Sequence, residues 1–428
     1  MATDIKDFIH AVDAAAVMGL LPARPRLLAL GEPTHGDNSL LDLRNDLFRQ
    51  LVEQEGYRTI ALESDCVKGL AVDDYITSGT GTLDEAMEQG ISHGWGAFTA
   101  NRELVRWMRA YNVRADHEGR PASERLRFAG FDGPLEITHA ASPRQSLTAL
   151  HGYLAARVAT DLLPCTSDAL DQLLGSDDRW TEPAAMTDPS RSAGRSADAA
   201  RLRLIADDLA ALLDQQMPRL LATGSGSEQD NRGNGQNDWE LARLYARTAT
   251  GLLRYHHWMA DSSPARMAWL VAVRDGMMAR NLLALAARGR TLVHAQNAHL
   301  QRPVSSMRMG GAPVEWWSAG ALAGAQLGAC YAFVATALGT IRHQGVDAPP
   351  PDTFEGLLYA LPEDRCVIDA PRLAAALGGT RPAPRVSPWF GYASLDPAHL
   401  AQADGVVFVK DVVERQNQGL SAAVRPAG

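Results

Sequence analysis

The stretch that decides the fold is Leu27-Leu28-Ala29-Leu30-Gly31-Glu32-Pro33-Thr34-His35-Gly36. Its apolar first half, bounded by glycine and proline, is typical of a buried strand that ends in a turn. From Ser39 to about Gln54 leucines recur at helical spacing, which predicts a helix directly after the turn. Glu32 and His35 therefore stand on the loop at the carboxyl end of a strand, where open α/β sheets bind ligands.

Later segments repeat this arrangement of a buried strand that ends in a polar residue. Residues 58–62 predict a second strand ending at Glu63, and residues 126–131 predict a third ending at Asp132. A strand over 291–293 runs into Gln296-Asn297-Ala298-His299. Further strands are predicted at 330–336, 365–368 and 405–409. Strand, helix and strand in succession favour parallel pairing, so we expect an α/β fold with a mainly parallel central sheet flanked by helices.

The chain between residues 141 and 262 differs in composition from the parts on either side. Leucine and alanine recur there at helical spacing, which predicts a large all-helical insertion that forms a cap over the strand carboxyl ends. The composition near 176–198 and 223–238 predicts disordered loops. The second of these loops fits a lid and a plain surface loop equally well. The predicted α/β core then comprises residues 1–140 and 263–412, with a tail over 413–428.

The overall composition argues against several classes of protein. With 428 residues, 46% of them hydrophobic, the chain can bury a large core. A net charge of -9 argues against a sequence-independent nucleic-acid binder, which needs an excess of lysine and arginine to neutralise phosphates. The four cysteines lie far apart without a CxxC pair, so we expect reduced thiols.

Nothing in the sequence predicts contact with a membrane. The N-terminal residues lack the apolar core of a signal peptide, and residues 5–20 predict an amphipathic helix. The uncharged stretch 318–341 is rich in glycine and alanine, and we interpret it as a buried helix followed by a strand. We therefore expect a cytoplasmic protein that acts on a small molecule; the oligomeric state does not follow from the sequence.

The polar residues at the strand ends are the candidates for chemistry. Each one alone also fits a helix N-cap or a turn, and for Asp132 the two interpretations are equally good. For His35 and Glu63 the repeated placement at strand ends favours function, because histidines and carboxylates in one crevice suit general acid–base catalysis. His93 and Trp95 interrupt a helical pattern and are predicted to line the pocket.

Familiar catalytic motifs are missing from the sequence. It has no GxSxG elbow between a strand and a helix, no HExxH and no phosphate-binding loop. We therefore expect neither a cofactor nor a metal ion, although His35, His299 and the carboxylates are residue types that bind metals.

An ordered set of motifs resembles the erythromycin esterase family, which includes succinoglycan-biosynthesis-like proteins. The motifs are Gly31-Glu32-x-Thr34-His35-Gly36, Ala61-Leu62-Glu63, the pattern E…W.RxYN over 103–112, Arg274-Asp275-x-x-Met278-Ala279-x-Asn281, Asn297-x-His299, Gly328-x-x-Tyr331 and the strand 404–409. The resemblance spans about 26–412 and implies an α/β core with a helical insertion, and hydrolysis of a macrolide lactone by imidazole-activated water without a covalent serine intermediate. By position it implies an active site of Glu32, His35, Arg44, Glu63 and His299. Arg44 also fits a salt bridge on a helix surface.

One position departs from the family pattern. Where the family usually has His-Asn-x-His, this chain has Gln296-Asn297-Ala298-His299. A neutral amide cannot act as a general base, so either His35 or His299 activates water, or His294 does so from two positions earlier on the strand, or the reaction is no longer simple ester hydrolysis.

The sequence leaves three readings open. The first is a metal-independent, esterase-like hydrolase, with Glu32 and Glu63 orienting the histidines and Arg44 or Arg274 stabilising the oxyanion. The second is a tailoring enzyme of natural-product biosynthesis, catalysing cyclisation, elimination or acyl transfer in the same pocket. The third, the weakest, is a binding protein that has lost catalysis. The residues predicted to contact the substrate are Asp132, Arg274, His93, Trp95, Asn297, His294 and Gln296.

Overall fold

The computed structural model describes residues 8–136, 139–222, 228–309, 311–378, 381–389 and 391–413, without the side chains of 228–236. Contacts divide the chain into two compact units. The first unit comprises residues 1–64, 68–131 and 282–428 and contains a large sheet. The second unit comprises residues 65–67 and 132–281 and is mainly helical.

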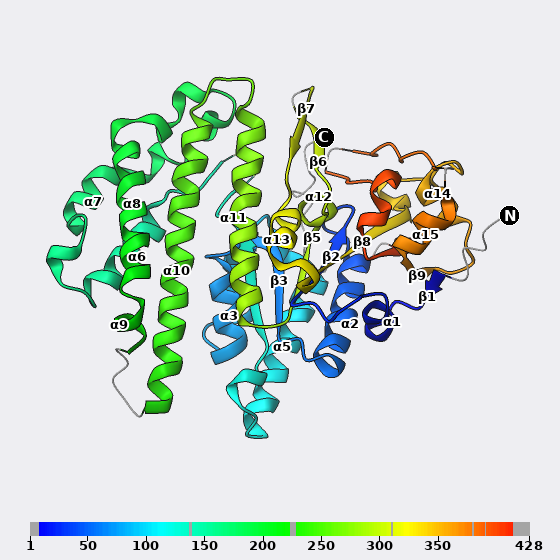
Figure 1. Ribbon diagram of the computed structural model, residues 1–428, viewed down its shortest axis with the longest axis horizontal. Helices are drawn as coiled ribbons and strands as arrows, with labels where there is room; N and C mark the ends of the chain where they lie inside the picture. Colours follow the sequence, from blue (N-terminus) through cyan, green and yellow to red (C-terminus); the bar gives the residue numbers. More distant parts are fainter. Residues whose placement is uncertain are drawn as a thin grey trace. The chain divides into compact units, whose positions relative to one another are not determined.

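An eight-stranded sheet forms the centre of the first unit, in the order β1-β9-β10-β8-β2-β5-β3-β4 (Figure 1). Its strands are β1 (Ile9–His10), β2 (Leu27–Glu32), β3 (Thr59–Asp65), β4 (Arg127–Asp132), β5 (Thr291–Gln296), β8 (Tyr331–Thr340), β9 (Arg365–Asp369) and β10 (Gly405–Asp411). β2 pairs in parallel with β5 and β8, β5 with β3, and β8 with β10. β9 runs antiparallel to its neighbours β1 and β10. The prediction of an α/β fold with a mainly parallel sheet is confirmed.

The helices of the first unit begin and end at residues suited to those places. They are α1 (Ala14–Gly19), α2 (Asn38–Gln54), α3 (Gly69–Ser78), α4 (Leu83–Gly90), α5 (Thr99–His117), α12 (Asn297–Leu300), α13 (Ala319–Leu327), α14 (Phe354–Tyr359) and α15 (Ala370–Leu377). The Asp37 carboxylate accepts the Ser39 N–H and caps α2, and Thr82 and Glu85 form a capping box at α4. The leucine face of α2 packs into one core with Leu28 and Leu30 of β2.

The order of the strands creates a crevice at the carboxyl ends of β2 and β5. From β2 the chain passes through α2 to β3, which lies beyond β5 in the sheet. From β5 it continues to β8, which lies on the other side of β2. The connections therefore leave two adjacent strands in opposite directions, and such a switch point is where open α/β sheets bind ligands.

The second unit is built from helices with their own apolar core. They are α6 (Arg144–Ala155), α7 (Ser167–Leu174), α8 (Ala197–Gln215), α9 (Met217–Ala222), α10 (Glu228–Met259) and most of α11 (Arg266–Arg288). Leu147, Leu202 and Leu253 belong to one buried cluster, from α6, α8 and α10 respectively. The buried Trp180 ring packs into this cluster and donates its indole N–H to the Leu174 carbonyl at 2.9 Å.

Two local predictions need correction, and one element was not predicted. The predicted helix 5–20 is shorter: Ile9–His10 pair with β9, and the Asp13 carboxylate accepts the Ala16 N–H, which starts α1 only at residue 14. The loop near 176–198, predicted to be disordered, contains four short 3-10 helices between residues 177 and 195. Three of them are capped by side chains of Glu182, Asp188 and Ser192. A hairpin of β6 (Ser305–Met309) and β7 (Ala312–Trp316) was not predicted.

Of the other predicted loop, 223–238, residues 223–227 lie outside the described residues, and α10 begins at Glu228. The uncharged stretch 318–341 forms α13 followed by β8, as predicted. No helix in the described part of the chain combines the length and apolar character needed to cross a bilayer.

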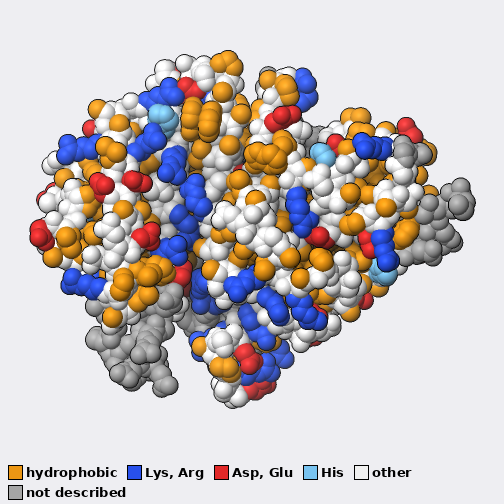
Figure 2. Space-filling view, in the orientation of Figure 1, with side chains coloured by type: hydrophobic (Ala, Val, Ile, Leu, Met, Phe, Trp, Pro, Cys, Tyr) orange, Lys and Arg blue, Asp and Glu red, His pale blue; other side chains and the backbone are white. Residues whose placement is uncertain are grey.

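The surface charge is unevenly distributed. Figure 2 shows lysine and arginine side chains gathered along the part of this face that α10 occupies. Arg243 and Arg254 of α10 are exposed.

Candidate active site

The Glu32 carboxylate lies between two imidazole rings at the switch point. Its Oε1 atom is 2.7 Å from Nδ1 of His35, and its Oε2 atom is 3.2 Å from Nε2 of His294. Glu32 is the last residue of β2, and His35 follows on the turn, so the sequence motif itself brings the first pair together. The sheet register supplies the second pair, because β5 runs alongside β2.

The Glu63 carboxylate holds the other side of the same cluster. Its Oε1 atom lies 3.4 Å from Nε2 of His299 and 3.8 Å from Nε2 of His35. Its Oε2 atom accepts the backbone N–H of Gln296 at 2.9 Å, just beyond the last paired residues of β3 and β5, Leu62 and His294. Glu63 therefore ties the ends of these two strands together and also faces two imidazoles.

The protonation of this cluster is governed by mutual attraction between carboxylates and imidazoles. Burial would raise the pKa of Glu32, but His294 and His35 outweigh it and hold that pKa well below its usual range. Burial would lower the pKa of His35, but the Glu63 carboxylate and the hydrogen bond to Glu32 raise it above its ordinary value. His35 keeps 27% of its side chain exposed, whereas His294 and His299 keep 5% and 8%. His35 is thus the most accessible imidazole of the cluster.

Arg44 lies on the buried side of α2 rather than on the helix surface. Its guanidinium donates to the side-chain oxygens of Asn45, at 3.1 and 2.7 Å, and of Asn101, at 2.9 Å. Among the described residues no carboxylate forms an ion pair with it. Burial lowers the pKa of Arg44 to about 10, opposed by Glu32 and Asp42, so the group remains charged at neutral pH. The site therefore contains a buried positive charge whose hydrogen-bond partners are neutral.

A small cavity lies beside part of this cluster. Glu32, Arg44, Glu63 and His294 supply its polar walls. Its other walls come from Gly36, Leu41, Leu62, Ser64, Ile91, Trp95, Phe98 and Asn101. The space open to the centre of a water molecule is about 20 Å³, which is room for one ordered water.

Trp95 forms an aromatic wall beside His35. The ring centroids of His35 and Trp95 are 4.5 Å apart, and the angle between the ring planes is 37°. The ring centroids of His93 and Trp95 are 4.8 Å apart. His93 has a φ of 59° and Gly94 a φ of 71°, a left-handed pair that turns the chain into the short 3-10 helix Trp95–Ala97. Trp95 lines the cavity. That His93 and Trp95 contact the substrate stays a prediction.

Asn297 has a structural place that differs from the predicted contact with substrate. Its Nδ2 atom donates to the Thr336 carbonyl at 2.9 Å, and its Oδ1 atom accepts the Thr336 N–H at 3.2 Å. The side chain thus crosses the end of β2 and pairs with the β8 backbone. A Cβ atom at Gly31 would lie 2.1 Å from Asn297 Oδ1, so only glycine allows this crossing. Since both amide atoms are engaged, we assign Asn297 to the scaffold.

Gln296 does not join the chain of carboxylates and imidazoles through its side chain. Its Nε2 atom donates to the carbonyl of Gly391 at 2.5 Å, and the residue is buried. Its backbone N–H is the group that contacts Glu63. The amide therefore anchors the segment around residue 391 to the end of β5.

Asp132 and Arg274, both predicted to contact substrate, pair with each other within the second unit. Arg274 Nη2 and Nε lie 2.6 and 3.0 Å from Asp132 Oδ2. Asp132 is fully buried and also accepts the Gly133 N–H at 2.7 Å. Their predicted role at the substrate stays a prediction, and the charge of Arg274 is already balanced by its partner.

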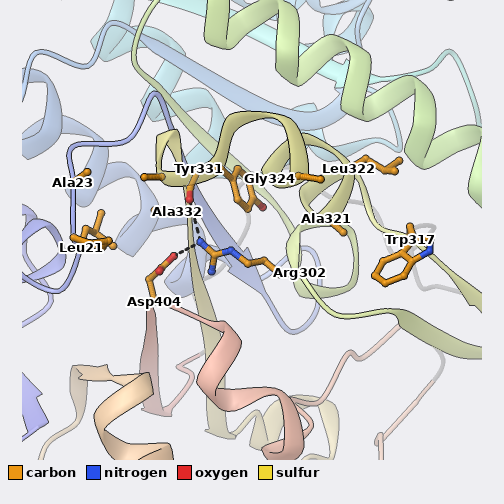
Figure 3. Close-up of a pocket in the computed structure, with 14 residues that line it drawn as sticks. Leu21, Ala23, Arg302, Trp317, Ala321, Leu322, Gly324, Tyr331, Ala332 and Asp404 are labelled. Carbon is orange, nitrogen blue, oxygen red and sulfur yellow. Dashed lines mark hydrogen bonds and ion pairs between the residues drawn. The ribbon is translucent and has the colours of Figure 1, made fainter.

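A larger cavity lies near the amino ends of β2, β8 and β10, away from the strand ends that carry Glu32 and Glu63. Figure 3 shows it between the segment Leu21–Ala23, helix α13 and the start of β8. Its volume is about 720 Å³. Arg302 reaches into it, but its guanidinium is bound by Asp404 Oδ2 at 2.7 Å and by the Tyr331 carbonyl at 3.0 Å. Because its two charged side chains, Arg302 and Asp404, bind each other and most of its other walls are apolar, we do not assign the reaction to this cavity.

Several parts of the site were not found from the sequence. Asn45 and Asn101, which hold Arg44, gave no signal, although Asn101 lies two residues before the E…W.RxYN pattern. The Gly391 contact also had no sequence signal. Within the described part of the chain, no group of three or more histidine, cysteine or acidic side chains is arranged to hold a metal ion.

Comparison with known proteins identifies the family. The sequence model of the erythromycin esterase family matches residues 52–412, and the chain therefore belongs to this family. The resemblance noted in the sequence is confirmed, although the matched span begins after Glu32, His35 and Arg44. Membership supports an esterase-like hydrolase in general terms. No curated protein matches the sequence.

Solved structures of related proteins share the fold over almost the whole chain. A protein from Bacillus cereus has a TM-score of 0.69 at 17% identity, covering 96% of this chain and 97% of its own. A succinoglycan biosynthesis protein has a TM-score of 0.66 at 15% identity, covering 96% of both chains. A mutant of the erythromycin esterase EreC in its open conformation has a TM-score of 0.57 at 19% identity, covering 90% of both. Similarity at this level of identity concerns the fold.

Proposed function

We propose that the protein hydrolyses a carboxylic ester or lactone with a water molecule that His35 activates. The observation that carries the proposal is the position of His35, the most accessible imidazole of the cluster, between the carboxylates of Glu32 and Glu63. Both carboxylates and Arg44 also border the cavity with room for one water. A macrolide or another natural product is the proposed substrate class, in keeping with the family. Neither a serine nucleophile nor a resident cofactor enters the mechanism.

The reaction follows from the position of each group. Glu32 accepts the proton on Nδ1 of His35, so Nε2, which lies 3.8 Å from Glu63 Oε1, is the atom that takes a proton from water. The resulting hydroxide attacks the carbonyl carbon, and the guanidinium of Arg44 stabilises the negative charge that develops on the carbonyl oxygen. The ester C–O bond then breaks, His35 returns its proton to the leaving alkoxide, and the products are a carboxylic acid and an alcohol.

A product assay tests the proposal directly. Purified protein is incubated with a panel of macrolides and simple aryl esters, and the products are followed by mass. Hydrolysis adds the mass of one water to a lactone or splits an ester into acid and alcohol. Failure to convert any member of the panel, at protein concentrations comparable to the substrate, would count against ester hydrolysis.

The pH dependence of kcat/KM follows from the raised pKa of His35. A general base must be unprotonated, so kcat/KM rises with pH and reaches half its plateau above 6.5, the ordinary value for histidine. In Glu63→Gln the strongest influence that raises the pKa of His35 is lost, so this pKa falls. The rise of kcat/KM with pH therefore begins at a lower pH. The free energy of unfolding depends on the same group. Charged His35 stabilises the fold fully below pH 6.5, and this contribution is lost as pH rises through the raised pKa.

The measurement is a pH–rate profile of both proteins, with NMR titration of the His35 ring in parallel. The titration is needed because Glu63→Gln also changes the wall of the cavity. If neither the midpoint of the pH–rate profile nor the midpoint of the His35 titration changes in Glu63→Gln, the assigned influence of Glu63 on the His35 pKa is wrong.

A second function is favoured by the tie between Gln296 and Gly391. Because this side chain contributes no imidazole, the pocket holds fewer proton acceptors than the family pattern implies. A tailoring reaction such as cyclisation, elimination or acyl transfer uses the same groups without consuming water. A product whose mass lacks the added water would identify this alternative.

A further inference from the structure

A buried histidine outside the proposed proton-transfer step borders the cavity from β5. His294 lies in register with Leu30 of β2 on one side and Leu62 of β3 on the other, so it belongs to an interior strand of the sheet. Only 5% of its side chain is exposed. It borders the same cavity as Glu32, Arg44 and Glu63.

Both ring nitrogens of His294 face oxygen atoms that can only accept a proton. Nδ1 lies 3.1 Å from the Leu30 carbonyl oxygen, and Nε2 lies 3.2 Å from Oε2 of Glu32. A neutral imidazole has one N–H and one lone pair, so in either tautomer a lone pair would face an oxygen. Both contacts are hydrogen bonds only when the ring carries two protons. In this arrangement His294 is a double donor and has no lone pair to accept a proton from water.

His294 and His35 contact different oxygens of the Glu32 carboxylate. With Oε2 bound by His294, the other oxygen, Oε1, is left for Nδ1 of His35. His294 itself contacts the Leu30 carbonyl, so the Glu32 carboxylate is tied through His294 to the backbone of β2. The other charged or titratable groups that border the cluster are Arg44, Glu63 and His299.

Gln296 shows that the neighbouring position does not share this role. Residues 294 and 296 project to the same face of β5, because side chains alternate along a strand. The Gln296 side chain, however, reaches the Gly391 carbonyl and not a carboxylate. His294 is thus the imidazole that β5 contributes to the site.

We infer that His294 is a positioning residue: as a doubly protonated donor it holds the Glu32 carboxylate ionised and oriented, and through Glu32 it fixes the ring of His35. The inference rests on the proposed function only for its effect on turnover. The hydrogen-bond arrangement itself can be tested without any substrate.

The substrate-free test is NMR of the wild-type protein with ¹⁵N-labelled histidine at pH 7. The expected result for His294 is two protonated ring nitrogens with slowly exchanging protons. His294→Gln identifies the signals, and His151→Gln, which removes another buried histidine in the second unit, is the matched control. A His294 ring with a single N–H overturns the inference.

The kinetic test uses the substrate that the product assay gives. His294→Gln is expected to lower kcat by about 10-fold to 100-fold with little change in KM, as is typical when an orienting partner of a reactive group is lost. The midpoint of the His35 ring titration shifts in the same variant, because its carboxylate partner is no longer clamped. His151→Gln leaves both quantities unchanged.

A second variant separates positioning from simple loss of structure. Residue 296 pairs in register with Glu32, so His294→Gln combined with Gln296→His offers the carboxylate an imidazole from the adjacent position. Partial recovery of kcat and of the His35 titration supports the positioning role. Wild-type kcat and an unmoved titration in a folded His294→Gln protein overturn it. Absence of turnover in the wild type would refute the proposed hydrolysis, while the NMR result would still decide the inference about His294.

Discussion

Replacing His35 by alanine is expected to lower kcat/KM by about 10² to 10⁴ while the fold is retained. The imidazole is the most accessible base of the site, and its Nε2 atom is the one left for water once Glu32 has bound Nδ1. Because part of the ring is exposed, removing it leaves little void in the core. The loss should therefore appear in kcat far more than in the melting temperature, which is measured alongside the rate.

The matched control is His117→Ala, at the exposed end of α5, which should keep the wild-type rate. Glu32→Gln offers a graded comparison, since it keeps the size of the partner but removes its charge, and its rate should fall between those of the wild type and His35→Ala. A His35→Ala protein that turns over substrate at the wild-type rate would remove His35 from the mechanism and leave His299 as the base.

Gly31→Ala is expected to destabilise the protein by about 2–4 kcal/mol. The added methyl group would meet Asn297 Oδ1 at 2.1 Å, so the amide must leave its two contacts with the Thr336 backbone or the strands must separate. Either response breaks buried hydrogen bonds and spreads the ends of β2, β5 and β8. A urea titration of both proteins measures the loss as a lower midpoint.

Gly19→Ala is the control for the general effect of replacing glycine. A Cβ atom at Gly19 meets nothing within 4 Å, and the residue lies in α1, so alanine there should be neutral or slightly stabilising. A Gly31→Ala protein with the wild-type midpoint would contradict the proposed crossing of Asn297 over β2.

The predictions that held depend on patterns within a short stretch of chain. Leu27–Leu30, bounded by glycine and proline, became β2. The carboxylates at the ends of β2 and β3 both reach His35, because parallel strands end at the same side of the sheet. The i, i+3 spacing of Glu32 and His35 on the turn yields a direct contact. Such features need no knowledge of distant residues.

The parts that the sequence did not reveal depend on residues far apart in the chain. From the sequence Arg44 fits a surface position on a helix. Its burial depends on Asn101, 57 positions later, which accepts a hydrogen bond from it. The Gln296 side chain meets a backbone carbonyl 95 positions away, and a carbonyl leaves no mark on the sequence. The β6–β7 hairpin contains Pro313, and proline within a run argues against a strand. The 3-10 helices within residues 176–198 are stabilised by side-chain caps, and each helix is too short to produce a periodic pattern in the sequence.

The sheet order has a consequence for synthesis of the chain. β2 pairs only with β5 and β8, and Glu32 is 262 residues from its partner His294. At roughly 20 residues per second, the upper end of typical translation rates, β2 waits about 13 s for its first neighbour. During that time an apolar strand has two unpaired edges, a condition that promotes aggregation. A nascent chain of this protein is therefore expected to depend on a chaperone until β5 emerges from the ribosome.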